Sequence, residues 1–264
     1  MPRIAILGGG VMGETLLSAL VAAGHRDVVV AEKFTERAEA LRAEHGVEVV
    51  DPRAASRGAD VLLVAVKPQD VPDLLAEVRP EIAPGAVVVS LAAGVRTTVI
   101  EDALEPGVAV VRAMPNTPAL VGEGMFGVSA GASAGDDQVA GVVALLATAG
   151  DVAVVDEAHQ DAVTAVSGSG PAYVFYLAEA MVEAGTAEGL DEDVARRLAA
   201  QTLTGAAALL TSGDEGPAEL RRKVTSPNGT TAAAIESFDA AGVRGALVAG
   251  IRAAARRSAE LSGS

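Results

Sequence analysis

The sequence has no cysteine and no tryptophan, and aromatic side chains make up only 2% of its 264 residues. Without cysteine, disulfides, thiol catalysis and cysteine-ligated zinc are excluded. The three histidines, His25, His45 and His159, are scattered without metal-ligand spacing, so we expect no metal site. Because half of the residues are apolar and few are aromatic, we expect a core made mostly of alanine, valine and leucine.

Positive charge is also scarce, since the chain has 35 Asp and Glu but only 20 Lys and Arg, and its net charge is −15. Basic patches supply most of the affinity for nucleic acid, so this balance argues against a nucleic-acid partner. It does not exclude an anionic substrate, because a site can be locally positive or lined by amide N–H groups. No apolar run is long enough to cross a bilayer and no signal peptide precedes the first predicted strand, so we expect no membrane partner and a cytoplasmic location.

The most informative stretch is the beginning of the chain. A short β-rich run at residues 3–7 is followed by GGGVMG (Gly8–Gly13), which fits G-x-G-x-x-G, and then by leucines at helical spacing. Gly8 permits a tight turn, Gly10 lets the backbone approach a pyrophosphate, and Gly13 lets the helix pack on the strand. N–H groups at the start of the helix favour phosphate. This context predicts dinucleotide binding; the alternative is a glycine-rich turn in an α/β domain without a cofactor.

The signal for the choice of coenzyme is mixed. Glu32 follows the next apolar run, about twenty residues beyond the glycine loop, where a carboxylate can accept a hydrogen bond from a ribose hydroxyl. Such a carboxylate repels a 2′-phosphate and favours NAD. Lys33 and Arg37 can instead hold that phosphate. The alternative is that all three residues belong to a solvated helix start.

Apolar runs alternate with helical patterns up to about residue 155, as in a parallel α/β sheet. Val61–Val66 is continuously apolar, as expected of a strand buried on both faces. Lys67 ends this run at the carboxyl edge, where we expect it to contact cofactor or substrate unless it is a solvated strand end. Asn116 lies between two prolines, and we expect its amide to be free to bond a ligand unless it forms an Asx turn.

From Asp156 onward the apolar spacing is helical, which predicts an all-α second domain. We therefore assign residues 1–157 to a dinucleotide-binding domain and residues 158–264 to a helical domain. The predicted helix Pro171–Gly185 is apolar nearly all round, with two glutamates as its only charges, which is typical of a helix buried on all sides. Because so small a domain struggles to bury this helix alone, we expect it to be buried in a dimer interface.

The predicted loops offer amide N–H groups, hydroxyls and one lysine, with no Ser-His-Asp set and no paired-carboxylate motif. This inventory suits binding a carboxylate and polarising a C=N or C=O bond while a cofactor supplies hydride. Ser226–Thr231 is a polar, glycine-bearing run ahead of a helix, and such a run is a good carboxylate site. The alternative is a multiply satisfied helix cap.

Several of these stretches together resemble the pyrroline-5-carboxylate reductase family, which catalyses the last step of proline biosynthesis. The glycine loop is shared with many dehydrogenases, whereas MPNTP, SGSGPAY and SP-x-GTT are together close to diagnostic. The matching stretches, in the order of the family, are GGGVMG (8–13), AVKP (65–68), RAMPNTPALVGEGM (112–125), AVSGSGPAYVF (165–175), AAQT (199–202) and VTSPNGTT (224–231).

The resemblance implies a Rossmann-type α/β domain followed by an all-α dimerisation domain, with the active site at the interface of a homodimer or larger homo-oligomer. It implies reduction of 1-pyrroline-5-carboxylate to L-proline by hydride transfer from NADPH or NADH. Thr231 matches the hydroxyl residue near the ring nitrogen and is the expected catalytic residue. The expected cofactor contacts are Gly8, Gly9, Gly10, Val11, Met12, Gly13, Glu32, Lys33, Ala65, Val66, Lys67 and Pro68, and the expected substrate contacts are Asn116, Ser226, Gly229, Thr230 and Thr231.

Two positions depart from the pattern of the family. Asn228 stands where glycine is usual, which a left-handed conformation tolerates, and Pro52 stands about where many members place an Asn near the adenosine. Two other functions stay open: a related imine reductase or 3-hydroxyacid dehydrogenase, and a non-catalytic dinucleotide-binding protein. The 3-hydroxyacid enzymes place a catalytic lysine on a long helix of the second domain, whereas residues 158–185 contain no lysine. A non-catalytic protein would need no polar loops facing the glycine loop.

Overall fold

The computed structural model describes residues 1–263, and the chain divides into two compact units. The first unit contains residues 1–168 and the segment from Ala254 onward, and the second is Ser169–Ala253. The predicted second domain ends at Ser264, which lies outside the described residues. The first unit extends past residue 157 because the buried Gln160 is tied to the sheet, its Nε2 donating to the Gly127 carbonyl oxygen at 3.0 Å.

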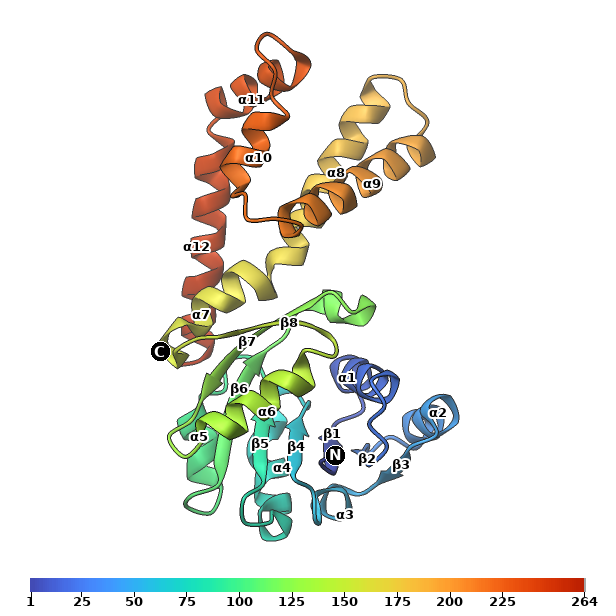
Figure 1. Ribbon diagram of the computed structural model, residues 1–264, viewed down its shortest axis with the longest axis vertical. Coiled ribbons are helices and arrows are strands. Elements are labelled where there is room, and N and C mark those ends of the chain that lie inside the picture. Colours follow the sequence, from blue (N-terminus) through green and yellow to red (C-terminus); the bar gives the residue numbers. More distant parts are fainter. Residues whose placement is uncertain (264) are drawn as a thin grey trace. The chain divides into compact units, whose positions relative to one another are not determined.

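The first unit is built on one eight-stranded sheet (Figure 1). The strand order is β3-β2-β1-β4-β5-β6-β7-β8, and neighbours are parallel except the antiparallel pair of β6 and β7. The chain order reverses between β1 and β4, and the carboxyl ends at such a reversal are where open α/β sheets bind ligands. The strands are β1 (Ile4–Leu7), β2 (Val28–Ala31), β3 (Glu48–Val50), β4 (Val61–Val64), β5 (Val87–Ser90), β6 (Ala109–Met114), β7 (Gly124–Ala130) and β8 (Gly150–Val154).

Helices cover both faces of this sheet, because β1, β2, β4 and β5 are buried at every position. One face packs against Leu17 and Leu41 of the covering helices, and the other against Leu75 and Ile100. The alternation predicted from the sequence is therefore confirmed. The helices are α1 (Val11–Ala22), α2 (Thr35–His45), α3 (Pro52–Ser56), α4 (Val71–Val78), α5 (Thr97–Ala103), α6 (Asp136–Leu146) and α7 (Gln160–Val163), with 3₁₀ turns at Pro68–Asp70, Arg79–Glu81, Thr117–Val121 and Glu157–His159.

An ion pair ties the chain after β8 to the rest of the first unit. Glu157 Oε1 lies 3.3 Å from Nη1 of Arg112 in β6, whose side chain is 4% exposed. The same carboxylate accepts hydrogen bonds from the N–H and hydroxyl of Thr97 at the start of α5, at 2.8 and 2.6 Å. Burial acts to raise the pKa of Glu157, but Thr97 and Arg112 outweigh it and hold the pKa below its ordinary value. An ionised Glu157 therefore links α5, β6 and the exit from the sheet.

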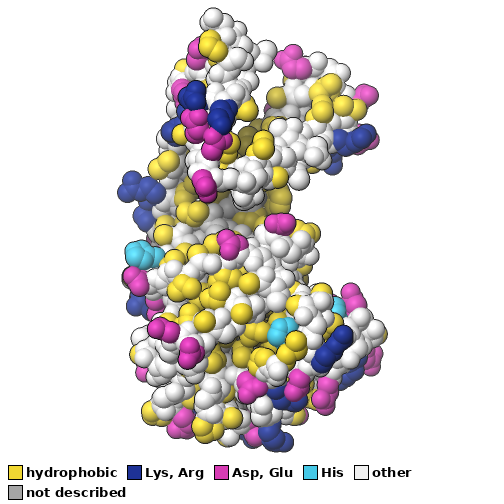
Figure 2. All heavy atoms as spheres, in the orientation of Figure 1, with side chains coloured by type: hydrophobic (Ala, Val, Ile, Leu, Met, Phe, Trp, Pro, Cys, Tyr) yellow, Lys and Arg dark blue, Asp and Glu magenta, His cyan; other side chains and the backbone are white. Residues whose placement is uncertain are grey.

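The second unit is helical and has little core of its own. Between Ser169 and Ala253, Ala195 and Ala199 are the only hydrophobic side chains that are buried, and α8 buries none. Hydrophobic side chains lie at the surface of this unit (Figure 2). No helix within residues 1–263 is long and apolar enough to cross a membrane. The helices are α8 (Gly170–Ala187), α9 (Glu192–Thr211), α10 (Pro217–Lys223), α11 (Thr230–Ala240) and α12 (Val243–Leu261), the last of which ends in the first unit.

We expect a second copy of the chain to cover this apolar surface, so light scattering should report at least a dimer. Phe175 of α8 is 63% exposed, and buried aromatic side chains are typical anchors of protein interfaces. Phe175→Asp would place a charge at such an anchor and should shift the protein toward monomers. Val99→Asp changes a 50% exposed apolar side chain of the first unit and serves as the control. A stable wild-type monomer at low micromolar concentration would contradict the prediction.

Candidate functional site

The glycine loop between β1 and α1 has the shape of a phosphate cradle. Gly8 has a φ of +113°, and a Cβ there would lie 3.0 Å from the carbonyl carbon and oxygen of Ala65. A Cβ on Gly13 would lie 1.9 Å from the Gly8 carbonyl oxygen, so only glycine lets α1 pack this closely. At Gly10, by contrast, a Cβ would meet nothing within 4 Å. The space left open above Gly10 fits the approach of a pyrophosphate.

Helix α1 begins directly at this open space. Gly10 is its N-cap residue, and no side chain caps the helix. The first N–H groups of an α-helix have no partner within the helix, and together with the helix dipole they favour an anion. Val11, the first residue of the helix, is 65% exposed. The glycine loop therefore fits the pyrophosphate of a dinucleotide, for which the start of α1 would supply the N–H groups, since those of Gly8 and Gly9 already donate to the Ala31 carbonyl oxygen and to Glu32.

The end of β4 forms the neighbouring wall of this cradle. The Ala65 N–H donates to the Leu7 carbonyl oxygen at 2.9 Å, which holds the end of β4 beside β1. Val66 Cγ1 lies 3.1 Å from the position that a Gly8 Cβ would take. Lys67 is exposed at the strand end, and Pro68 opens the following 3₁₀ turn. The structure thus brings Ala65 and Val66 against the glycine loop, and cofactor contacts by these four residues stay a prediction.

Glu32 is not part of a solvated helix start. Its Oε2 accepts a hydrogen bond from the Gly9 N–H at 3.0 Å, and its Oε1 accepts one from the Phe34 N–H at 2.9 Å. Lys33 does fit that alternative, since it is exposed and its ammonium lies 5.3 Å from the centroid of the Phe34 ring. The carboxylate of Glu32 is therefore fixed beside the glycine loop at the end of β2.

Arg37 of α2 also binds the glycine loop. Its Nε donates to the Gly9 carbonyl oxygen at 2.8 Å, and its Nη2 forms a close ion pair with Oε2 of Glu14 in α1. Glu14 Oε1 lies 3.4 Å from Nε2 of His45. Partial burial acts to raise the pKa of Glu14, but Arg37 and His45 outweigh it and hold the pKa below its ordinary value. One ligand atom each of Glu14, Glu44 and His45 lie within 4.8 Å of one another, yet the guanidinium of Arg37 already pairs with Glu14, so Glu14 needs no metal ion.

Glu14 was not among the residues predicted from the sequence. An acidic residue in the first turn of a helix is common, because the helix dipole favours it there. Its spacing from the glycine loop gives no sign that its partner is Arg37, which comes from the next helix.

Asn116 connects the segment after β6 to strand β7 and to a π-helical turn of the first unit. Its Oδ1 accepts a hydrogen bond from the Met125 N–H at 2.9 Å, and its Nδ2 donates to the carbonyl oxygen and the hydroxyl of Ser167 at 3.2 and 3.3 Å. Ser167 lies in a π-helical turn, Thr164–Gly168, and helical periodicity alone does not predict such a turn. The expected free amide is therefore wrong, since both its acceptor and its donor are engaged. A substrate contact by Asn116 stays a prediction.

The second unit carries the other predicted substrate residues on one loop. The Gly229 N–H donates to the Ser226 carbonyl oxygen at 3.1 Å. Asn228 has a φ of +59°, a left-handed conformation, which asparagine tolerates. Gly229 is the N-cap of α11, no side chain caps this helix, and Thr230 and Thr231 form its first turn. The helix-cap alternative gains no support from this arrangement, and the N–H groups of this turn suit a carboxylate.

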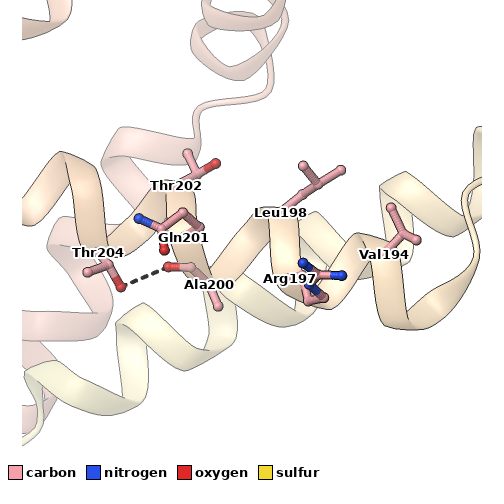
Figure 3. Close-up of a pocket in the computed structure, with 7 residues that line it drawn as sticks. All are labelled: Val194, Arg197, Leu198, Ala200, Gln201, Thr202 and Thr204. Carbon is pink, nitrogen blue, oxygen red and sulfur yellow. Dashed lines mark hydrogen bonds between the residues drawn. The ribbon is translucent and has the colours of Figure 1, made fainter.

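A surface hollow of about 690 Å³ runs along α9 in the second unit (Figure 3). It contains none of the predicted site residues, and the Thr204 hydroxyl beside it is bonded to the Ala200 carbonyl oxygen at 2.9 Å. The apolar side chains of Val194 and Leu198, which line it, are 41% and 54% exposed, as expected of a surface that a second copy of the chain would cover. The lining residues are Val194, Arg197, Leu198, Ala200, Gln201, Thr202 and Thr204.

Two alanine substitutions in the glycine loop should have opposite effects. Gly10→Ala adds a methyl group into open space, so the melting temperature should stay near that of wild type while dinucleotide affinity falls about tenfold or more. Gly13→Ala forces a methyl group against the Gly8 carbonyl and should cost about 1–3 kcal/mol of unfolding free energy. Thermal melts and calorimetric titration with dinucleotide measure both effects. If a folded Gly10→Ala variant keeps its affinity for the dinucleotide, the pyrophosphate does not bind at this loop.

Comparison with known proteins supports the same assignment. Residues 157–261 match the family model described as pyrroline-5-carboxylate reductase dimerisation, and residues 3–94 match the one described as NADP oxidoreductase, coenzyme F420-dependent. A pyrroline-5-carboxylate reductase of Corynebacterium melassecola is 42% identical over 267 residues, which cover 99% of each chain.

Solved structures agree with this sequence relationship. The structure of a pyrroline-5-carboxylate reductase from Coxiella burnetii has a TM-score of 0.94 and 33% identity, and the match covers 98% of each chain. The structure of Plasmodium falciparum pyrroline carboxylate reductase with NADP bound has a TM-score of 0.85 over 99% of this chain and 98% of that one, and at 24% identity it supports the fold. From the close sequence relatives and this fold, the chain belongs to the pyrroline-5-carboxylate reductase family.

Proposed function

We propose that this protein reduces 1-pyrroline-5-carboxylate to L-proline by hydride transfer from NADPH or NADH. The observation that carries the proposal is the 42% identity to a pyrroline-5-carboxylate reductase over 99% of both chains. The glycine cradle and the uncapped start of α11 fit the cofactor and the substrate carboxylate of that reaction. The proposed location is the cytoplasm, which holds a pool of the NAD(P)H that the reduction consumes.

Cofactor binding is assigned to the first unit. Gly8–Gly13 would hold the pyrophosphate, and Ala65–Pro68 would line the neighbouring part of the nucleotide. Glu32 and Arg37 keep the loop in shape through Gly9. When bound, the cofactor supplies the hydride.

Substrate binding is assigned to the loop that opens α11. Ser226, Gly229 and Thr230 would hold the carboxylate through hydroxyl and N–H groups, where the positive end of the helix dipole favours negative charge. Thr231 would place its hydroxyl at the ring nitrogen. A protonated imine is the better electrophile, and the nitrogen becomes an amine as hydride arrives. Because a threonine hydroxyl is too weak an acid for stoichiometric proton donation near neutral pH, we assign Thr231 the role of orienting the imine and relaying a proton from water.

Association is part of the proposal. The helical unit lies within the residues that match the dimerisation family model. Its helices bury hardly any apolar side chains among themselves. We propose that a homodimer or larger homo-oligomer completes the active site at the interface. The alternative of a 3-hydroxyacid dehydrogenase has less support, since α8 carries no lysine. A non-catalytic protein would not need the uncapped loop at Ser226–Thr231.

The sharpest test of the proposed mechanism is Thr231→Val, which keeps the shape of the side chain and removes its hydroxyl. Removing one such contact typically lowers the rate about tenfold to a thousandfold, so kcat/KM for pyrroline-5-carboxylate should fall within that range. Binding of NAD(P)H should be nearly unchanged. Steady-state rates of NAD(P)H oxidation and a melting curve, measured on the same preparation, test this.

The matched control is Thr211→Val at the end of α9, where the hydroxyl is bonded to the carbonyl oxygens of Ala207 and Ala208. It removes the same group outside the predicted site and should leave kcat/KM near the wild-type value. If Thr231→Val has wild-type kinetics and a lowered melting temperature, Thr231 is not part of the active site. A wild-type protein that does not turn over pyrroline-5-carboxylate with either coenzyme would contradict the proposed function itself.

A further inference from the structure

We propose that Glu14 acts as a positioning residue for coenzyme choice: it holds Arg37 on the glycine loop, away from a ribose 2′-phosphate, so that the protein favours NADH over NADPH. The proposal rests on the proposed function for the class of cofactor. It assigns a role to a side chain of α1 that is not itself one of the expected cofactor contacts.

A 2′-phosphate at the end of β2 needs a cation in a suitable geometry. Arginine binds phosphate best through two parallel N–H groups, which form one edge of the guanidinium. In this structure the edge made by Nε and Nη2 of Arg37 is already taken. Nε donates to the Gly9 carbonyl oxygen at 2.8 Å, and Nη2 forms its ion pair with Glu14.

The ion pair with Glu14 is what makes this arrangement persist. The carbonyl oxygen of Gly9 is neutral, whereas Glu14 carries a full negative charge in the first turn of α1, where the helix dipole also stabilises it. The side chains of Arg37 and Glu14 are 32% and 25% exposed, and His45 behind them is 9% exposed, so water screens the pair only in part. Without that charge, Arg37 would keep only its bond to Gly9 and could turn toward the nucleotide.

Glu32 acts in the same direction from the other side of the loop. Both of its carboxylate oxygens are fixed by backbone N–H groups, those of Gly9 and Phe34. Each oxygen keeps a further lone pair with which to accept from a ribose hydroxyl. A 2′-phosphate would instead meet a fixed negative charge there. Lys33 is a further cation next to Glu32 in the sequence, but its ammonium is an exposed point charge and does not offer the paired N–H groups of a guanidinium.

Calorimetric titration of the full-length protein with NAD⁺ and NADP⁺, without substrate, tests the proposal. The wild type should bind NAD⁺ more tightly than NADP⁺. Glu14→Gln keeps the size of the side chain and removes its charge, so NADP⁺ affinity should rise about fivefold while NAD⁺ affinity changes less than about twofold. In the double variant Glu14→Gln with Arg37→Ala this gain should disappear.

The single variant Arg37→Ala separates the two possible roles of the arginine. If Arg37 only holds the loop, both nucleotides should lose affinity by similar factors. The control is Arg42→Ala on the same helix. It also removes a guanidinium charge, but the guanidinium of Arg42 donates to the Val49 carbonyl oxygen at 2.6 Å. It should leave the ratio of the two affinities unchanged. A melting curve for each variant confirms that it is folded.

Two results would overturn the inference while leaving the proposed function intact. One is an Arg37→Ala variant that loses NADP⁺ affinity at least tenfold more than NAD⁺ affinity, which would place Arg37 on the 2′-phosphate already. The other is a Glu14→Gln variant with the wild-type ratio of affinities in a protein that still reduces pyrroline-5-carboxylate. A wild type that binds neither nucleotide would contradict the inference and the proposed function together.

Discussion

The close approach of Gly13 to the carbonyl group of Gly8 is the constraint on which the proposed cofactor site depends. No side chain fits between them, since a Cβ on Gly13 would lie 1.9 Å from that oxygen. The contact fixes where α1 begins, and the start of α1 determines where its unpaired N–H groups and its dipole act. Backbone bonds from Gly8 to Ala31 and from Ala65 to Leu7 then hold the loop between β2 and β4. The proposed phosphate site is made of backbone groups and needs this rigidity, because the loop itself has no charged side chain to compensate for a loose fit.

The two units reach stability by different routes. The sheet of the first unit has a hydrophobic layer on each face, whereas the described part of the second unit buries hardly any apolar side chains. Burial of apolar surface is the main favourable term in folding, so helices α8 to α11 need a further surface to cover them. The match of this region to a dimerisation family fits that need. Association, folding of the helical unit and completion of the substrate loop are therefore expected to be linked.

Local patterns predicted much of this fold, and contacts between distant segments account for what they missed. The strand–helix alternation, the buried central strands and the all-helical second domain follow from hydrophobic spacing. Asn228 has the left-handed conformation that the glycine usual at this place in the family suggested. The engagement of the Asn116 amide depends on Ser167, which a π-helical turn delivers. In the same way, the bonds of Glu32 and Arg37 to Gly9 join segments more than twenty residues apart in the chain. Spacing predicted that Glu32 lies near the glycine loop, but periodicity and spacing carry no signal for these particular hydrogen bonds.

The central claim is that hydride passes from a dinucleotide held by the glycine loop to the imine carbon of the substrate. Transfer of deuterium from reduced coenzyme in which both hydrogens at C4 of the nicotinamide are replaced by deuterium tests it most directly. After incubation with pyrroline-5-carboxylate, mass spectrometry of the product should show proline that carries one deuterium, on the ring carbon that was the imine carbon of the substrate. Oxidation of the coenzyme without labelled proline, or unlabelled proline formed in its presence, would contradict the account.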